Sequence, residues 1–192
     1  MILGVGAFVR VGILLLLAVV LQLSALSQLP IFGGHADVVV LTVAAIAYYG
    51  GSVPGSAVGF AAGLLLDLLS GATMGASSLV LTAVGYGVGR FREVRDPSHG
   101  LLPVPVGSLA TAGWVVAFAA VSLMLDIGAR VSPLVIREMV MTVLINALLA
   151  LPVFTGARKL LRPSLADDPL EVRRRRRPPR EAGPLGLRGM EV

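Results

Sequence analysis

The chain has 192 residues, of which 56% are hydrophobic and 14% are charged, and its mean hydropathy is +0.87. Soluble domains carry about 25% charged residues, so this composition indicates a membrane protein. The chain has no cysteine, which excludes disulfides and thiolate chemistry, and its net charge is +5.

The positive charge lies mainly outside the apolar segments. Arg173 to Arg177 form a run of five near the C-terminus, and most other arginines flank apolar segments. This pattern is typical of membrane topology and not of a nucleic-acid-binding face, so we expect no nucleic-acid partner.

Six segments are interpreted as membrane-spanning helices, because a span needs about 17–25 mostly apolar residues. In chain order they are Val11–Leu29, Asp37–Tyr49, Val53–Leu69, Met74–Gly89, Val104–Leu125 and Leu134–Phe154. The second to fourth are short and rich in glycine, so five spans remain an alternative if the second and third form a re-entrant pair. The first span is long for a secretory signal and offers only a poor cleavage site, at Ser24-Ala25-Leu26-Ser27, so we expect it to be retained.

The predicted fold class is therefore all-α, as a polytopic integral membrane protein. Residues 1–160 are expected to form the transmembrane domain. Residues 161–192 are expected to form a disordered basic tail, because they are rich in Arg, Pro and Gly and have no helical periodicity.

The distribution of basic residues predicts the orientation. With the N-terminus in the cytoplasm, the inner ends of the spans hold seven basic residues, namely Arg10, Arg90, Arg92, Arg95, Arg158, Lys159 and Arg162. The outer ends hold two, Arg130 and Arg137. Both termini are therefore expected to be cytoplasmic, which places Asp37, Asp67 and Asp126 at the outer leaflet.

A ridge of small residues runs through the third span at four-residue spacing. Its candidate packing or docking residues are Gly55, Gly59, Gly63, Gly71 and Gly75, and Asp67 occupies the position between Gly63 and Gly71. Glycines at this spacing allow close approach of another helix in a bilayer. The ridge is interpreted either as internal packing of this chain or as a surface that docks a partner helix.

Four polar residues in apolar sequence, Asp37, Asp67, Arg137 and Asn146, are candidate functional residues, because buried polar groups are expensive in a membrane. Asp67 and Arg137 lie at matching depth, so we predict an ion pair between them. Asn146 faces away from Arg137 and is expected to bond across helices.

Few residues are available for catalysis. One lysine and two histidines leave little material for acid–base or Schiff-base chemistry, and no phosphate-binding glycine loop or serine–histidine–acid set is recognisable. His35 and Asp37 could be two metal ligands, but no third is obvious, so Asp37 is interpreted as a helix cap. We predict a protein that is not an enzyme and that has no metal or cofactor.

The basic tail is expected to contact either anionic lipid headgroups or an acidic face of a cytoplasmic partner. The residues concerned are Arg173, Arg174, Arg175, Arg176 and Arg177. Each basic residue near an anionic membrane surface contributes about 1 kcal/mol, which favours anionic lipids.

Over residues 10–160 the chain resembles the family of rod shape-determining protein MreD. The resemblance is carried by Asp37-Val38-Val39-Val40, by the block from Gly59 to Gly71 with Gly-Leu-Leu-Leu-Asp-Leu-Leu-Ser-Gly at its end, by Gly75, by Gly85-Tyr86, and by Arg137-Glu138 and Asn146 in the sixth span. It implies a non-catalytic inner-membrane subunit of the complex that elongates the lateral cell wall and maintains rod shape. The implied partners are MreC, RodA, a class B penicillin-binding transpeptidase and the MreB filament.

The resemblance also implies a fold similar to that of the substrate-binding components of energy-coupling-factor vitamin importers, which supplies an alternative function. Those components dock through an Ala-x-x-x-Ala pattern in the first span, which this chain lacks. A vitamin pocket also needs convergent polar and aromatic groups, and the chain has a single tryptophan, Trp114. The scaffold function is therefore favoured over the importer function.

Overall fold

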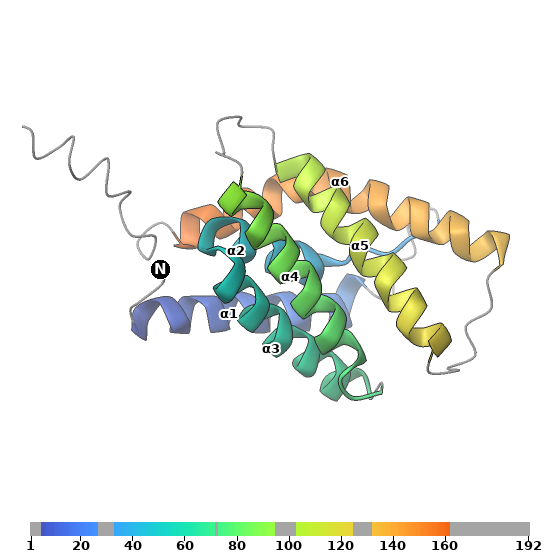
Figure 1. Ribbon diagram of the computed structural model, residues 1–192, viewed down its shortest axis with the longest axis horizontal. Coiled ribbons are helices and arrows are strands. Elements are labelled where there is room, and N and C mark those ends of the chain that lie inside the picture. Colours follow the sequence, from blue (N-terminus) through green and yellow to red (C-terminus); the bar gives the residue numbers. More distant parts are fainter. Residues whose placement is uncertain (1–4, 27–32, 72, 95–102, 125–131, 162–192) are drawn as a thin grey trace, which may run out of the picture.

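The computed structural model describes residues 5–26, 33–71, 73–94, 103–124 and 132–161 (Figure 1). The elements are α1 (Val5–Leu21), a π-helical turn η1 (Gln22–Leu26), α2 (Val38–Gly50), α3 (Ser52–Ser70), α4 (Ala76–Val94), α5 (Pro103–Met124) and α6 (Pro133–Leu161). Each helix overlaps one predicted span, and no strand occurs in these ranges. The all-helical fold class is confirmed.

Helix α2 forms the centre of the molecule. Ten of its residues, from Val39 to Tyr48, are buried, and it contacts α1, α3, α4, α5 and α6 (Figure 1). A helix that is apolar on all sides is stable only where other helices surround it. At 13 residues it is about 20 Å long, which is shorter than the bilayer core. It is therefore the core helix around which the others pack.

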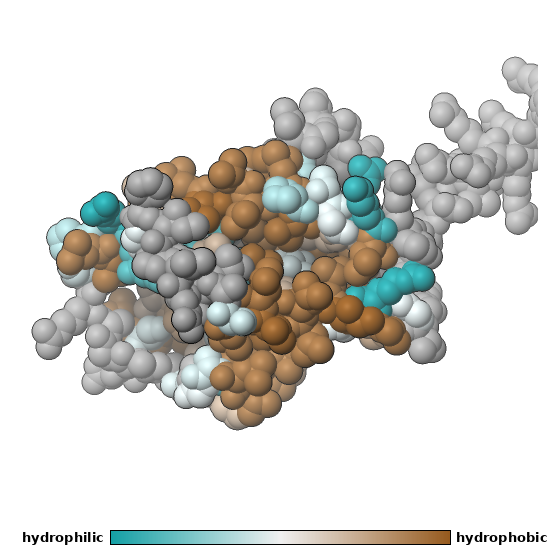
Figure 2. Space-filling view, turned by 180° about the vertical axis from the view of Figure 1, so that it is seen from behind, coloured by the Kyte–Doolittle hydropathy of each residue, from teal (hydrophilic) through white to brown (hydrophobic). Residues whose placement is uncertain are grey.

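The outer helices have the composition of membrane spans. By length and hydropathy α3, α5 and α6 could each cross a bilayer, while α1 and α2 contribute shorter apolar stretches, Phe8–Ser24 and Val38–Gly50. Charged residues in the last turns of α4 lower its hydropathy. Large apolar side chains are exposed on α1, α3, α4, α5 and α6, and Figure 2 shows hydrophobic residues across the middle of one face. These features identify a membrane protein, and the number of six crossings stays a prediction.

The helices that follow one another along the chain also run in opposite directions where they pack. Gly55 and Gly63 on α3 approach Gly85 and Ser78 on α4 respectively, so α3 and α4 are antiparallel. On α5 and α6, Thr111 meets Asn146 and Gly107 meets Ala150, which is again an antiparallel order. This order is the one that successive membrane crossings require.

Candidate functional site

The glycine ridge of α3 lies against α4. A Cβ added to Gly55 would lie 2.5 Å from the carbonyl oxygen of Gly85, and one added to Gly59 or Gly63 would collide with the backbone of Leu81 or Ser78. All three glycines are buried. They let the two backbones approach more closely than any side chain would allow.

Helix α4 contributes its own glycines to the same contact. A Cβ on Gly85 would collide with the carbonyl of Gly55, and one on Gly89 would lie 2.5 Å from the carbonyl oxygen of Gly51. We call the contact made by Gly55, Gly59, Gly63, Gly85 and Gly89 the glycine interface. Because this face of α3 is already occupied by α4, it is not free to dock an outside helix, and the internal-packing interpretation agrees with the structure.

Gly71 and Gly75 have a different role from the ridge. Gly71 ends α3 with φ of 65°, and Gly75 precedes α4 with φ of 98°. An added Cβ would meet nothing within 4 Å at either position. Neither glycine therefore packs against a helix among the described residues; both lie in the α3–α4 turn, where glycine tolerates a positive φ, and contact with a partner stays a prediction.

Asp67 caps the start of α4 from the last turn of α3. It is 1% exposed, and its Oδ2 accepts hydrogen bonds from the backbone amides of Gly75 at 2.8 Å and Ser77 at 3.2 Å. The first amides of a helix lack intrahelical acceptors and carry the positive end of the helix dipole. A buried carboxylate is stabilised at this position without a cation.

The predicted ion pair between Asp67 and Arg137 is wrong. Arg137 is exposed on α6, and among the described residues the salt bridges join His35 to Glu138 and Arg90 to Glu93. Matching depth in two helices does not fix the direction in which each side chain points. The amides of the adjacent turn lie closer along the chain and satisfy Asp67 first.

A second carboxylate caps the opposite end of the same hairpin. Glu93 Oε1 accepts hydrogen bonds from the Ser52 amide at 2.9 Å and the Ser52 hydroxyl at 2.6 Å, and Oε2 accepts one from Arg90 at 3.2 Å. The hydrogen bonds from Ser52 and Arg90 lower the pKa of Glu93 to about 2. Each helix of the hairpin thus carries, in its last turn, the cap of the other. Neither Glu93 nor Ser52 was predicted from the sequence.

At the far end of the molecule, α6 presents a polar stripe to the segment that leads into α2. Glu138, Thr142 and Asn146 follow at four-residue spacing and so share a face. His35 Nδ1 lies 3.2 Å from Glu138 Oε1, the His35 amide donates to the Thr142 hydroxyl at 3.1 Å, and the Asp37 amide donates to Asn146 Oδ1 at 3.0 Å.

Asn146 joins three elements. It is completely buried, and besides accepting from Asp37 its Nδ2 donates to the Thr111 hydroxyl of α5 at 3.2 Å. The interhelical hydrogen bond expected for Asn146 is present in the structure. The four-residue spacing of Glu138 and Asn146 was a signal in the sequence that could also have identified Thr142 between them.

Asp37 stands at the N-cap position of α2, but its side chain makes no capping hydrogen bond. Gln22 of η1 takes that role, because its Oε1 accepts from the Val39 amide at 2.8 Å. The Gln22 Nε2 donates to Asp37 Oδ1 at 3.1 Å. The expected cap is therefore supplied by Gln22, and Asp37 Oδ1 is held by the same amide group.

These groups line a cavity of about 410 Å³ between η1, α5, α6 and the segment before α2. We call it the polar pocket, and it is lined by Gln22, His35, Asp37, Trp114, Phe118, Glu138 and Thr142, with apolar neighbours. Trp114 and Phe118 are stacked, with ring centroids 5.1 Å apart. The expectation that convergent polar and aromatic groups are missing is wrong, because residues far apart in the sequence meet here.

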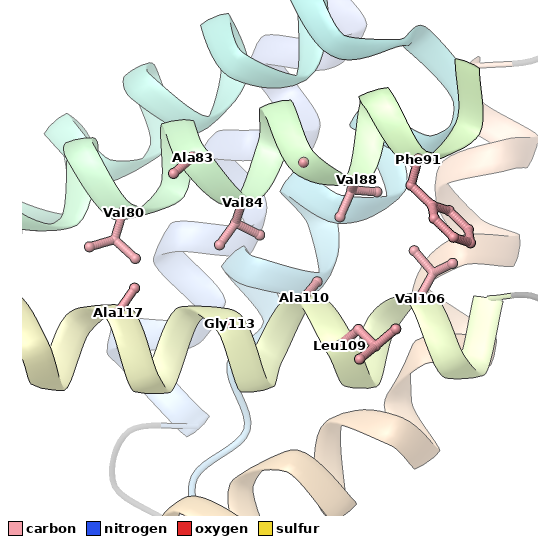
Figure 3. A pocket seen from close by; sticks show the side chains of 11 residues that line it. Val80, Ala83, Val84, Val88, Phe91, Val106, Leu109, Ala110, Gly113 and Ala117 are labelled. Atoms are coloured by element: carbon pink, nitrogen blue, oxygen red, sulfur yellow. The ribbon is translucent and has the colours of Figure 1, made fainter. Parts of the chain in front are cut away.

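A second cavity, also of about 410 Å³, is an apolar groove between α4 and α5. Figure 3 shows Val80, Val84 and Val88 of α4 opposite Ala110 and Ala117 of α5, with Phe91 and Val106 at one end. We call this cavity the α4–α5 groove. Its walls contain Gly87 and Gly113, and a Cβ at either position would meet nothing within 4 Å.

Two further predictions concern the basic tail and a metal site. Arg173 to Arg177 lie outside the described residues. Among the described residues no three His, Asp or Glu side chains are placed to hold a metal ion.

Comparison with known families gives one result. The family model described as rod shape-determining protein MreD matches residues 4–162. No curated protein and no solved structure matches this chain. The expected similarity to energy-coupling-factor components therefore has no support from these comparisons.

Proposed function

Because the chain belongs to the MreD family of rod shape-determining proteins, we propose that it is a non-catalytic scaffold of the lateral cell-wall elongation complex. Family membership implies a role in determining rod shape, and it is the observation that carries the proposal. The protein acts in the inner membrane with MreC, and near RodA, a class B penicillin-binding transpeptidase and MreB. Both termini are cytoplasmic, and the basic tail contacts anionic lipids.

The scaffold function is tested by complementation of shape. A rod-shaped bacterium depleted of its own MreD becomes round, and expression of this chain together with its cognate MreC restores rods. Expression of MreC alone is the control. If cells stay round although both proteins reach the membrane, the proposed function is wrong.

We place the single transmembrane helix of MreC in the α4–α5 groove. The glycine interface accounts for Gly55, Gly59, Gly63, Gly85 and Gly89 by packing within this chain. Gly87 and Gly113 have no such explanation, because they face open space on the two walls of one apolar groove. Inside lipid, helices associate through close packing of small residues, and these walls offer it.

The groove has the length that a partner helix needs for a local crossing contact. Its α4 wall runs from Val80 to Phe91, which is three helical turns or about 16 Å. Ala83 and Gly87 on α4 stand at four-residue spacing, and Ala110, Gly113 and Ala117 on α5 follow at three and four. With this spacing the small residues of each wall lie on one face of their helix, and both faces can contact the MreC helix.

The docking site is tested by filling the groove. Gly87→Leu and Gly113→Leu place side chains on the walls of the groove, where an added Cβ meets nothing within 4 Å, so we expect the protein to be made in normal amounts. We expect MreC co-purification in mild detergent to fall about tenfold or more, since small-residue contacts are lost. The matched control is Gly156→Leu on α6, where a Cβ also meets nothing within 4 Å.

Retention of MreC by both groove variants would move the MreC site elsewhere on the surface. An equal loss in Gly156→Leu would show that the effect does not depend on the groove. Neither result concerns the shape complementation, which tests the family function separately.

A further inference from the structure

We propose that the polar pocket binds an organic cation through an ammonium or guanidinium group. The pocket holds two carboxylates, Asp37 and Glu138, against one imidazole, His35. Even with His35 protonated the pocket keeps a net negative charge. This charge excludes an anionic ligand and favours a positively charged group.

One carboxylate oxygen is free to receive that group. Asp37 is partly buried at the wall of the pocket, and its Oδ1 accepts a hydrogen bond from Gln22, whereas no described residue donates a hydrogen bond to its Oδ2. The neighbouring basic residue on α6, Arg137, is exposed and makes no salt bridge with the pocket carboxylates among the described residues. A carboxylate oxygen of this kind can accept a charge-assisted hydrogen bond from a cation that enters the cavity.

The pocket also has an aromatic wall. Trp114 is 9% exposed and stacks on Phe118, and both line the cavity. Tryptophan is the side chain that attracts cations most strongly through its ring face. Two carboxylates and an indole in the lining of one cavity together suit a planar guanidinium or an ammonium group.

A metal ion is a poorer occupant than an organic cation. No three His, Asp or Glu side chains within the described part of the chain are placed to ligate a metal. The cavity of about 410 Å³ is also far larger than an ion and lies in the range of small-molecule sites. The cation is therefore either a free organic molecule or the end of a Lys or Arg side chain of a partner.

The single tryptophan of the chain makes binding directly measurable, because Trp114 is the only indole. We titrate the isolated, detergent-solubilised protein with butylguanidinium and follow tryptophan fluorescence, using uncharged butyramide as the matched probe. We expect a saturable change with butylguanidinium only, weakened by salt at about 0.5 M.

The variants Asp37→Asn and Glu138→Gln keep shape and hydrogen-bonding capacity and remove one charge each. Each is expected to weaken butylguanidinium binding about tenfold or more. The control is Glu93→Gln, a carboxylate at the opposite end of the molecule, which leaves binding unchanged. A linear response, an equal response to butyramide, or unchanged affinity in both pocket variants would overturn the proposal.

A second titration separates the two sources of the cation. It uses the complex with MreC and therefore rests on the proposed function, whereas the first titration does not. If a basic side chain of MreC occupies the pocket, butylguanidinium no longer binds in the complex. If the ligand is a free cation, the complex and the isolated protein bind it alike.

Discussion

Asp67 lies in the most apolar part of α3, and its partners are the amides of Gly75 and Ser77 eight and ten residues further along. Two backbone donors and the start of a helix stabilise a carboxylate at 1% exposure. The stability of the protein should therefore depend on the charge of Asp67 and not on cations elsewhere in the molecule. The chemistry is local to one turn.

We therefore expect Asp67→Asn to lower the free energy of unfolding by about 1–3 kcal/mol, because one donor loses its charged acceptor in a buried site. Arg137→Gln is expected to change it by less than about 0.5 kcal/mol, since Arg137 is exposed. Thermal unfolding in detergent measures both, and the double variant should equal the sum of the single effects. If Arg137→Gln has a large effect on stability in the wild-type background and none in the Asp67→Asn background, the two residues do form an ion pair and the present assignment is wrong.

At the scale of elements, the α3–α4 hairpin is held by glycines in the middle and by carboxylate caps at both ends. Gly59 has the backbone of Leu81 against it, whereas Gly87, on the same helix as Leu81, faces open space. Each glycine belongs to a row of small residues at four-residue spacing, Gly59 on α3 and Gly87 on α4. Only Gly59 is required for packing within the chain.

Gly59→Ala is expected to destabilise the protein by about 1–3 kcal/mol, because the added methyl group forces the helices apart. Gly87→Ala adds a methyl group in open space and is expected to be neutral or slightly stabilising. Detergent melting temperatures of the two variants compare a buried and an open glycine directly. Equal effects would contradict the placement of the glycine interface.

The Glu93 cap at the other end of the hairpin makes the stability of the protein depend on pH. Glu93 lies beyond the predicted fourth span, and its pKa is lowered from 4.5 to about 2 by hydrogen bonds from Ser52 and Arg90. The ionised carboxylate thus stabilises the folded state above pH 4.5, and this contribution is lost as the pH falls from 4.5 toward 2. Glu93→Gln should lower the melting temperature at pH 7, and the difference from wild type should shrink at pH 3. A difference that is constant with pH would show that the charge of Glu93 is unimportant.

The features that depend on neighbouring residues could be predicted from the sequence, whereas those that depend on contacts between distant segments could not. Hydropathy located all six helices, because each needs only its own composition. Internal packing of the glycine ridge was one of two predicted alternatives. The partner of Asp67 was missed because depth along a helix says nothing about direction around it. The polar pocket was missed because Gln22, Asp37, Trp114 and Glu138 come from four separate segments, and no spacing rule joins them.

At the scale of the whole molecule, charged and polar groups gather at two opposite ends. Figure 2 shows hydrophilic residues toward the ends of a face whose middle is hydrophobic. At one end Arg92 donates to the carbonyl of Tyr49, and Glu93 holds Ser52. At the other, Glu138 meets His35, and Asp37 lines the polar pocket. A bilayer between the two ends would cover the apolar middle and leave both polar ends in contact with water.

The two ends make the orientation testable. Basic side chains are retained on the cytoplasmic side of short connections. Arg92, Arg158 and Lys159 fall in the last turns of α4 and α6, and Arg90 lies about one turn before the end of α4. We expect reporters fused at either terminus or between α4 and α5 to be cytoplasmic. Reporters placed near residue 32, within the α3–α4 turn or near residue 128 should be external. Substituting Arg90 and Arg92 together by Gln weakens the bias at one loop only, so the C-terminal reporter should keep its position. An external C-terminus in the unaltered chain would contradict this orientation. With a cytoplasmic N-terminus it would require an odd number of crossings, and with an external N-terminus it would place the polar pocket on the cytoplasmic side.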